Sequence, residues 1–173
     1  MRPELAQALH HRVYPITERI AIGQFATPDR ASYLLESGYT HVLNVSEAAS
    51  IIRPSVEGFR QVTDCPFDDF VRLPEDRAPG CLGVLHEMLR SEGSRVYLHC
   101  IACRNRSPTV LWFYLLACGV DDDAAKSLIT ERCLDAVPGH RNLVDDRLVD
   151  RVRVHGRKRF LPVSDPSVLE PAY

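Results

Sequence analysis

Apolar residues fall into short runs along the chain, and longer stretches with the periodicity of an amphipathic helix separate most of these runs. Runs of strand length occupy residues 13–16, 19–22, 41–45, 59–63 and 96–98. In the intervening stretches apolar residues recur every three or four positions, which places them on one face of a helix. This alternation predicts an α/β fold with a central, mostly parallel sheet of four or five strands flanked by helices. The first two runs are close enough to pair as an edge hairpin.

Helix boundaries are marked best at Thr27-Pro28-Asp29, where a hydroxyl cap precedes a proline and an acidic residue. Residues 109–118 are apolar almost all round, so we expect this helix to be the most buried one. Other helical patterns cover residues 1–12, 81–89, 121–132 and 142–155, whereas residues 46–58 and 72–79 are typical of loops. The loop at 46–58 follows a strand, on the side where open α/β sheets bind ligands.

The length of 173 residues and the apolar share of 45% fit one domain with a single core. We expect a catalytic domain over residues 1–160 and a proline-containing C-terminal tail over 161–173. A formal charge of −2 gives no global reason to bind nucleic acid or a membrane. The N-terminus lacks the apolar core of a signal peptide, and no apolar run approaches the ~20 residues that span a bilayer. We therefore expect a cytoplasmic protein with reduced cysteines, with a monomer favoured.

The chemistry concentrates in one stretch, Val96-Tyr97-Leu98-His99-Cys100-Ile101-Ala102-Cys103-Arg104-Asn105-Arg106-Ser107-Pro108-Thr109. Its pattern is strand, tight loop and helix, with Pro108 expected at the first helical position. Such a loop can turn its backbone N–H groups toward one point and bind an anion, helped by the helix N-terminus. That positive field favours a thiolate at Cys100, while Arg106 can hold two phosphate oxygens. A thiolate beneath a bound phosphate indicates covalent phosphoryl transfer.

The segment His99-Cys100-x5-Arg106-Ser107 resembles the signature of the cysteine-dependent protein tyrosine phosphatases, and most closely that of the compact dual-specificity phosphatases. The resemblance covers roughly residues 16–150. Its second element is Pro66-Phe67-Asp68-Asp69, which is similar to the family segment that carries the general acid. Asp69 precedes Cys100 by 31 residues, close to the family spacing. The resemblance implies a single-domain fold of the protein tyrosine phosphatase type and two-step hydrolysis of phosphate monoesters, with no cofactor and no metal.

The resemblance also implies roles for individual residues. Cys100 is the expected nucleophile, Arg106 the phosphate-binding side chain, and Asp69 the general acid and base, with the adjacent Asp68 as the alternative. Ser107 is expected to donate a hydrogen bond to the thiolate or to cap the helix. His99 is expected to anchor the loop. The phosphate cradle is expected to consist of the backbone amides of Ile101, Ala102, Cys103, Arg104, Asn105 and Arg106.

Cys103 departs from the family, which usually has glycine three residues after the nucleophile. Three interpretations stay open: a tolerated replacement for glycine, a redox partner that pairs with Cys100 under oxidation, or part of a Cys-x-x-Cys redox or metal site. A thioredoxin-like site needs neither Arg106 nor Asp69. A zinc site lacks a second ligand pair in the sequence.

The substrate is expected to be a phosphorylated protein, carrying phosphotyrosine and phosphoserine or phosphothreonine, because Arg104 is the only basic residue among the variable loop positions. Two alternatives remain: a small, non-protein phosphate ester as substrate, or a catalytically weak or silent module that binds phosphate or a phosphopeptide.

Overall fold

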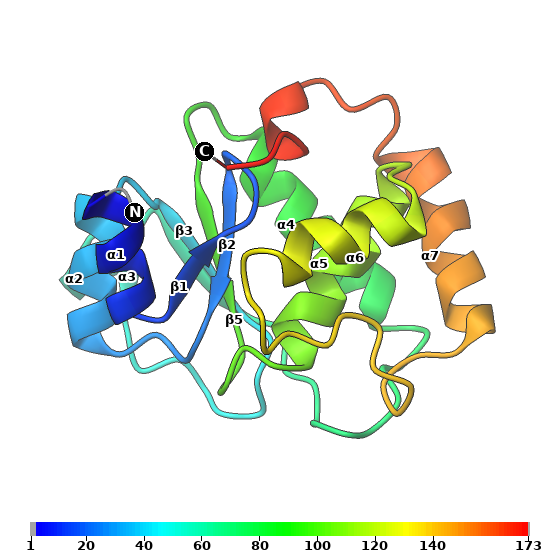
Figure 1. Cartoon of the computed structure of the whole chain (residues 1–173), viewed down its shortest axis with the longest axis horizontal. Helices are drawn as coiled ribbons and strands as arrows, with labels where there is room; N and C mark the ends of the chain where they lie inside the picture. The colour runs from blue at the N-terminus through cyan, green and yellow to red at the C-terminus, as the bar shows by residue number, and fades with distance from the viewer. Residues whose placement is uncertain (1–2, 173) are drawn as a thin grey trace.

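The structure is a computed structural model that describes residues 3–172. Its centre is a five-stranded sheet in the order β1-β2-β5-β3-β4 (Figure 1). Only β1 runs antiparallel to its neighbour, and the other pairs are parallel. The expected α/β fold with a mostly parallel sheet is thereby confirmed. The strands are β1 (Val13–Pro15), β2 (Ile20–Gly23), β3 (His41–Asn44), β4 (Gln61–Asp64) and β5 (Val96–His99).

Helices cover both faces of this sheet, with α1 to α3 on one side and α4 to α7 on the other (Figure 1). The strand alternation serves both layers: Ile20 and Ile22 join the core beneath α4 to α7, whereas Ala21 between them joins the smaller core beneath α2. The helices are α1 (Pro3–His10), α2 (Pro28–Glu36), α3 (Pro54–Glu57), α4 (Ala78–Arg90), α5 (Arg106–Ala117), α6 (Asp122–Thr130) and α7 (Asp146–Arg159), followed by the 3-10 helix η1 (Pro166–Val168).

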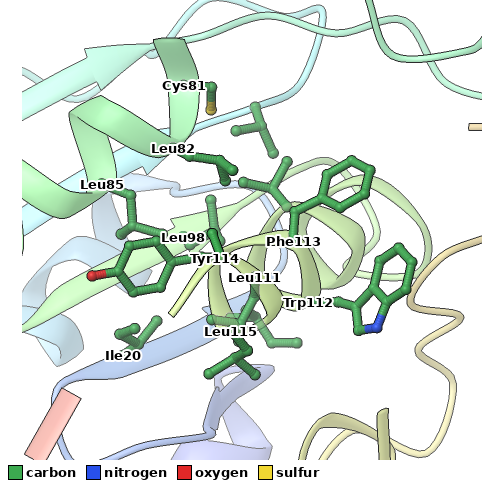
Figure 2. Close-up of a cluster of buried hydrophobic side chains, with 14 of the residues drawn as sticks. Ile20, Cys81, Leu82, Leu85, Leu98, Leu111, Trp112, Phe113, Tyr114 and Leu115 are labelled. Carbon is green, nitrogen blue, oxygen red and sulfur yellow. The ribbon is translucent and has the colours of Figure 1, made fainter. Parts of the chain in front are cut away.

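Helix α5 is the centre of the larger core, as its apolar sequence predicts. All of its residues are buried. Figure 2 shows side chains of α5 surrounded by Ile20 of β2, Leu98 of β5 and residues of α4. Helix α7 packs closely on α5, because Gly156 has no side chain: a Cβ there would lie 2.0 Å from the carbonyl oxygen of Ala117. A helix fixed on every side gives the loop that precedes it a rigid support.

The starts of two helices and the content of one loop differ from the sequence-based expectation. Helix α5 begins at Arg106, so Pro108 occupies its third position; a proline is tolerated there because the N–H groups of a first turn have no partner within the helix. Helix α7 begins four residues later than expected, since the carboxylate of Asp145 caps it by accepting from the amide of Leu148 at 2.9 Å. The loop expected at 46–58 contains the short helix α3.

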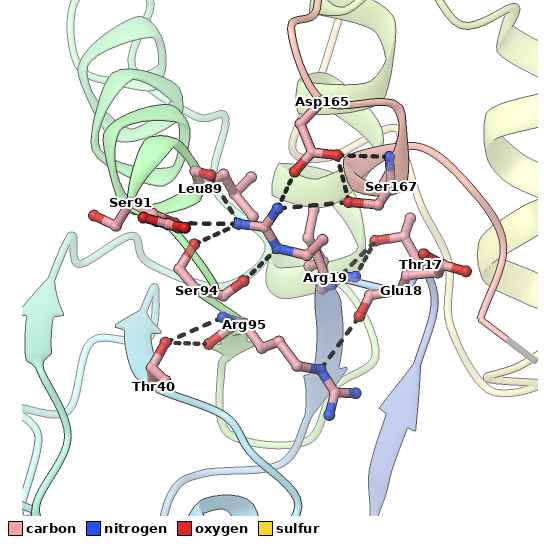
Figure 3. A network of polar contacts seen from close by, with 12 residues as sticks. Thr17, Glu18, Arg19, Thr40, Leu89, Ser91, Ser94, Arg95, Asp165 and Ser167 are labelled. Atoms are coloured by element: carbon pink, nitrogen blue, oxygen red, sulfur yellow. Dashed lines mark hydrogen bonds and ion pairs between the residues drawn. The ribbon is translucent and has the colours of Figure 1, made fainter.

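The segment expected as a C-terminal tail packs against the sheet layer in its described part. Arg19 is the last residue of the β1–β2 turn, and its guanidinium forms an ion pair with Asp165 and also donates to the carbonyl of Leu89 at 3.0 Å (Figure 3). Val168 is buried in the larger core. The segment thus joins α4, the β1–β2 turn and the larger core.

No helix within residues 3–172 is long and apolar enough to cross a membrane. All six cysteines of the chain are free thiols in the structure.

Candidate active site

The loop between β5 and α5 lies at the middle of the sheet edge. Gly23 of β2 and Asn44 of β3 both stand in register with His99 of β5, so the chain leaves all three strands side by side. Residues that follow β2 and β3 consequently flank Cys100. This position is the carboxyl edge of the parallel strands, where α/β sheets bind their ligands.

Neighbouring segments hold the loop by its carbonyl groups. The amide of Phe25 donates to the carbonyl of Ile101 at 3.1 Å, and the amide of Val137 donates to the carbonyl of Arg104 at 2.7 Å. In a trans peptide the carbonyl and the next N–H point in opposite directions. The N–H groups of Ala102 and Asn105 are therefore turned away from these neighbours. Backbone N–H groups oriented in this way can contribute to an anion-binding cradle.

Cys100 lies buried at the base of this loop, with 2% of its surface exposed. The hydroxyl of Ser107 donates to its sulfur at 3.3 Å. Ser107 is the second residue of α5, and the cap position belongs to Asn105, whose side chain makes no capping bond. The helix start thus places the Ser107 hydroxyl beside the sulfur, and the positive end of the α5 dipole points to the same place.

Arg106 is buried although its side chain is charged. Its guanidinium donates to the carbonyl of Phe67 at 2.9 Å, forms an ion pair with the carboxylate of Glu47, and lies 3.7 Å from a carboxylate oxygen of Asp69. Its Nε is buried without a hydrogen-bond partner. A buried donor of this kind carries a free-energy cost unless a further acceptor occupies the site.

Asp69 contacts the loop directly. The side-chain amide of Asn105 donates to its carboxylate at 3.2 Å, and the same carboxylate lies near Arg106. The side chain of Asp69 is 32% exposed. Asp68 is exposed, and among the described residues it makes no hydrogen bond or ion pair. Of the two candidate acids, the structure brings Asp69 to the loop.

Glu47 belongs to the site but did not stand out in the sequence. It follows β3, and its carboxylate pairs with Arg106; this hydrogen bond holds the pKa of Glu47 below its usual value. The signal that would have found it is the strand order, because only the placement of β3 next to β5 brings the start of the 46–58 loop to Arg106.

His99 lies behind the loop, fully buried between the rings of Phe25 and Tyr97. Its Nδ1 lies 3.2 Å from the carbonyl oxygen of Cys100. Burial lowers the pKa of His99 to about 4, so the ring is neutral near pH 7. A neutral ring packed in this way supports the loop from behind.

Cys103 adopts a left-handed backbone conformation, with φ of 60°. This is the region that glycine enters freely and that a residue with a Cβ enters at a cost of about 1–2 kcal/mol. Its buried sulfur lies 3.8 Å from the Ser107 hydroxyl and 4.0 Å from the sulfur of Cys133. The loop thus keeps the left-handed turn without glycine. Among residues 3–172 no group of three or more potential metal ligands is present.

Comparisons with known proteins agree with this geometry. No protein-family model matches the chain. Over 125 residues it is 26% identical to mouse protein tyrosine phosphatase type IVA 2, a match that covers 72% of this chain and 75% of the mouse protein. Its fold is similar to that of PTPMT1 solved in complex with PI(5)P, with a TM-score of 0.67, 14% identity and coverage of 85% and 96% of the two chains. It is similar also to human DUSP28, with a TM-score of 0.65, 15% identity and coverage of 85% and 94%.

The strand order, the loop between β5 and α5, and the similarity to the type IVA 2 phosphatase and to the two solved structures agree on one fold. The resemblance expected from the sequence is confirmed: the chain has the fold of the compact cysteine-dependent protein tyrosine phosphatases.

Proposed function

We propose that this protein hydrolyses phosphate monoesters in two steps through a phosphocysteine on Cys100. The observation that carries the proposal is the orientation of the loop: neighbouring segments hold the carbonyls of Ile101 and Arg104, which turns the amides of Ala102 and Asn105 away from those segments. With the buried Arg106, these donors match the oxygens of one phosphoryl group. Neither a structural thiol nor a thioredoxin-like site has a use for such a cradle.

In the first step the Cys100 thiolate attacks phosphorus, and the bond to the leaving oxygen breaks. Asp69 gives a proton to that oxygen, which requires the carboxyl to swing from Asn105 toward the leaving group. In the second step Asp69 takes a proton from water as the water attacks the phosphocysteine. The Ser107 hydroxyl, at 3.3 Å from the sulfur, stabilises the thiolate that departs.

The residues at the rim of the cradle support a proposal for the substrate class. Ile101 and Ala102 are its exposed apolar residues, Arg104 is its only exposed base, and Glu47 adds a negative charge at its edge. A ligand with several phosphates would meet too few cations here. We therefore propose that the substrates are single phosphate groups of proteins, on tyrosine and on serine or threonine. We also propose that the protein acts as a monomer in a reducing compartment such as the cytoplasm.

A non-protein ester is the second candidate, because a structural neighbour, PTPMT1, was solved in complex with PI(5)P. Initial rates on a phosphotyrosine peptide, a phosphothreonine peptide and a water-soluble phosphoinositide, measured side by side, separate the two classes. The protein assignment predicts higher kcat/KM on at least one peptide than on the phosphoinositide.

The basic test is hydrolysis of an aryl phosphate by fully reduced protein in the presence of EDTA. We expect turnover in wild type, none in Cys100→Ser, and a loss of about 10²–10³-fold in Arg106→Lys, because an ammonium cannot reproduce the two parallel bonds of the guanidinium. Absence of turnover by wild type, with inorganic phosphate or vanadate still bound, would instead select a silent phosphate-binding module.

A further inference from the structure

Two cysteines that the proposed reaction does not use as nucleophiles lie sulfur to sulfur beside the cradle. Cys103 is part of the loop, and Cys133 follows helix α6. Their Sγ atoms are 4.0 Å apart, and the residues are 1% and 2% exposed. Cys133 is held by its own backbone, since its amide donates to Ile129 and its carbonyl accepts from Ala136. The pair therefore meets as a fixed element of the fold.

The distance between these sulfurs is short enough for a bond to form by small movements. A disulfide needs an S–S separation of about 2.05 Å, so the two Sγ atoms must approach by about 2 Å. The thiol of Cys133 also lies 3.8 Å from the Cys103 carbonyl, which keeps the two residues together.

The sulfur of Cys100 shares a neighbour, the Ser107 hydroxyl, with the sulfur of Cys103. The Ser107 hydroxyl lies 3.3 Å from the Cys100 sulfur and 3.8 Å from the Cys103 sulfur. Cys103 thus shares the Ser107 hydroxyl with the proposed nucleophile and also contacts Cys133. The hydrogen bond from Cys103 lowers the pKa of Cys133, whereas burial raises the pKa of Cys103, so Cys133 is the member of this pair that ionises first.

We propose that Cys103 and Cys133 form a disulfide and that its formation returns oxidised Cys100 to the thiolate. The inference rests on the proposed function, because it uses the reactive Cys100 thiolate. In a first step this thiolate attacks hydrogen peroxide, which breaks the O–O bond and gives Cys100 sulfenic acid and hydroxide. The Cys103 thiol then attacks the Cys100 sulfur, the S–O bond breaks, and water leaves.

In the last step the Cys133 thiolate attacks the Cys103 sulfur, and Cys100 leaves as a thiolate. The sum is oxidation of two thiols to one disulfide while one peroxide is reduced to two waters, with Cys100 unchanged. The outcome is a nucleophile protected from irreversible sulfinic acid and a loop tied covalently to the segment after α6. A dithiol reductant restores the starting state.

The test is to treat reduced protein with one equivalent of hydrogen peroxide, block free thiols with iodoacetamide, and map the peptides without reduction. We expect wild type to show a Cys103–Cys133 linkage with the mass loss of two hydrogens, and an alkylated Cys100. Cys133→Ser and Cys133→Ala should stop at a Cys100–Cys103 linkage and lose the alkylation of Cys100. The Cys118→Ser variant is the matched control, since this buried thiol lies elsewhere in the core, and it should behave as wild type.

Two results would overturn the proposal: a Cys100–Cys103 linkage or a Cys100 sulfinic acid as the main product of wild type, or an undiminished Cys103–Cys133 linkage in Cys100→Ser. The wild-type map needs no substitution, so it decides even if a variant fails to fold. These readouts are separate from phosphate hydrolysis. A reduced protein that forms the linkage without turning over phosphate esters would refute the proposed function and leave the disulfide in place.

Discussion

The two loops that form the candidate site are built differently. The phosphate loop of residues 100–105 has buried residues at Cys100, Cys103 and Asn105, and neighbouring amides hold its carbonyls. The acid loop of residues 66–73 is anchored at Phe67 and Leu73, which are buried in the larger core, but its middle is open: Phe70 is 59% and Val71 55% exposed. Asp69 reaches the phosphate loop through one hydrogen bond from Asn105 and one ion pair with Arg106.

The contrast has a physical reason. Donors that stabilise a phosphoryl group are most effective when they are oriented before the substrate arrives, so they belong on a rigid support. A proton donor must instead follow the leaving oxygen of different substrates, and a loop whose middle has few buried contacts allows this movement. In the proposed mechanism the phosphate loop determines what is bound, and the acid loop determines when the bond breaks.

The largest effect tests the acid loop. Asp69→Asn should lower kcat on an alkyl phosphate, whose leaving group needs a proton, by about 10²–10⁴-fold. The loss should be much smaller on an aryl phosphate with an acidic phenol. Initial rates across a series of leaving groups measure this difference.

Asp68→Asn is the matched control, because Asp68 is exposed and adjacent. It should keep the wild-type dependence on the leaving group. If the rate depended more steeply on the leaving group in Asp68→Asn than in Asp69→Asn, Asp68 would be the acid. The contacts of Asp69 with the phosphate loop would then not identify the acid.

The rigid support of the phosphate loop predicts a pH effect on stability through His99. In the unfolded chain this ring takes up a proton near pH 6.5, but in the folded chain only near pH 4. The unfolded state binds more protons in this window, so stability falls as the pH falls from 6.5 to 4. The protonation of His99 accounts for a loss of about 3 kcal/mol in the free energy of unfolding at pH 4 relative to pH 8.

Urea unfolding at several pH values measures this loss in the free energy of unfolding. His99→Gln, which has no group that titrates in this window, should lose about 3 kcal/mol less than wild type between pH 8 and pH 4. If the free energy of unfolding changed equally with pH in the two proteins, His99 would not act as a buried neutral ring.

Glu47 orients the guanidinium from the rim of the phosphate loop. Glu47→Gln keeps the size and one acceptor oxygen but removes the charge, and we expect kcat/KM to fall about tenfold because Arg106 is held less firmly. The fall should appear mainly in kcat, since the guanidinium keeps its bond to the carbonyl of Phe67. Steady-state kinetics separate the two constants; an unchanged kcat with a raised KM would assign Glu47 to binding alone.

Cys103→Gly is expected to have the smallest effect. Glycine enters the left-handed region without strain, so the variant should be as active as wild type or more active, and its free energy of unfolding should change by at most about 1 kcal/mol. Cys103→Ala keeps the strain and loses the sulfur contacts, so it should be the less stable of the two. The reverse order, measured by urea unfolding, would show that the sulfur contributes more than the backbone strain costs.

The sequence predicted the elements whose signals are local. The strand before Cys100, the buried helix after Arg106 and the flanking α/β units follow from apolar periodicity, and the structure confirms them. Helix α5 begins earlier than Pro108 suggested, because a proline fits anywhere in a first turn. The short helix α3 has no buried residue, so it left no periodic signal.

Contacts between segments distant in the chain could not be predicted from the sequence, for a physical reason. Glu47 meets Arg106 only because β3 lies beside β5, and Cys133 meets Cys103 only because the segment after α6 returns to the loop. Local pattern carries no information on strand order or on such returns. The pairing of Asp69 with the loop could be expected only through the family resemblance, and its role stays a prediction.

The most direct measurement of the central claim is to trap the intermediate. Asp69→Asn is mixed with an aryl phosphate that has a good leaving group, quenched within the first turnover, and digested for mass spectrometry. The account predicts a phosphoryl group on the sulfur of Cys100, formed at the rate of the burst of phenol release and absent from Cys100→Ser. A burst without phosphorylated Cys100, or turnover that persists in Cys100→Ser, would contradict it.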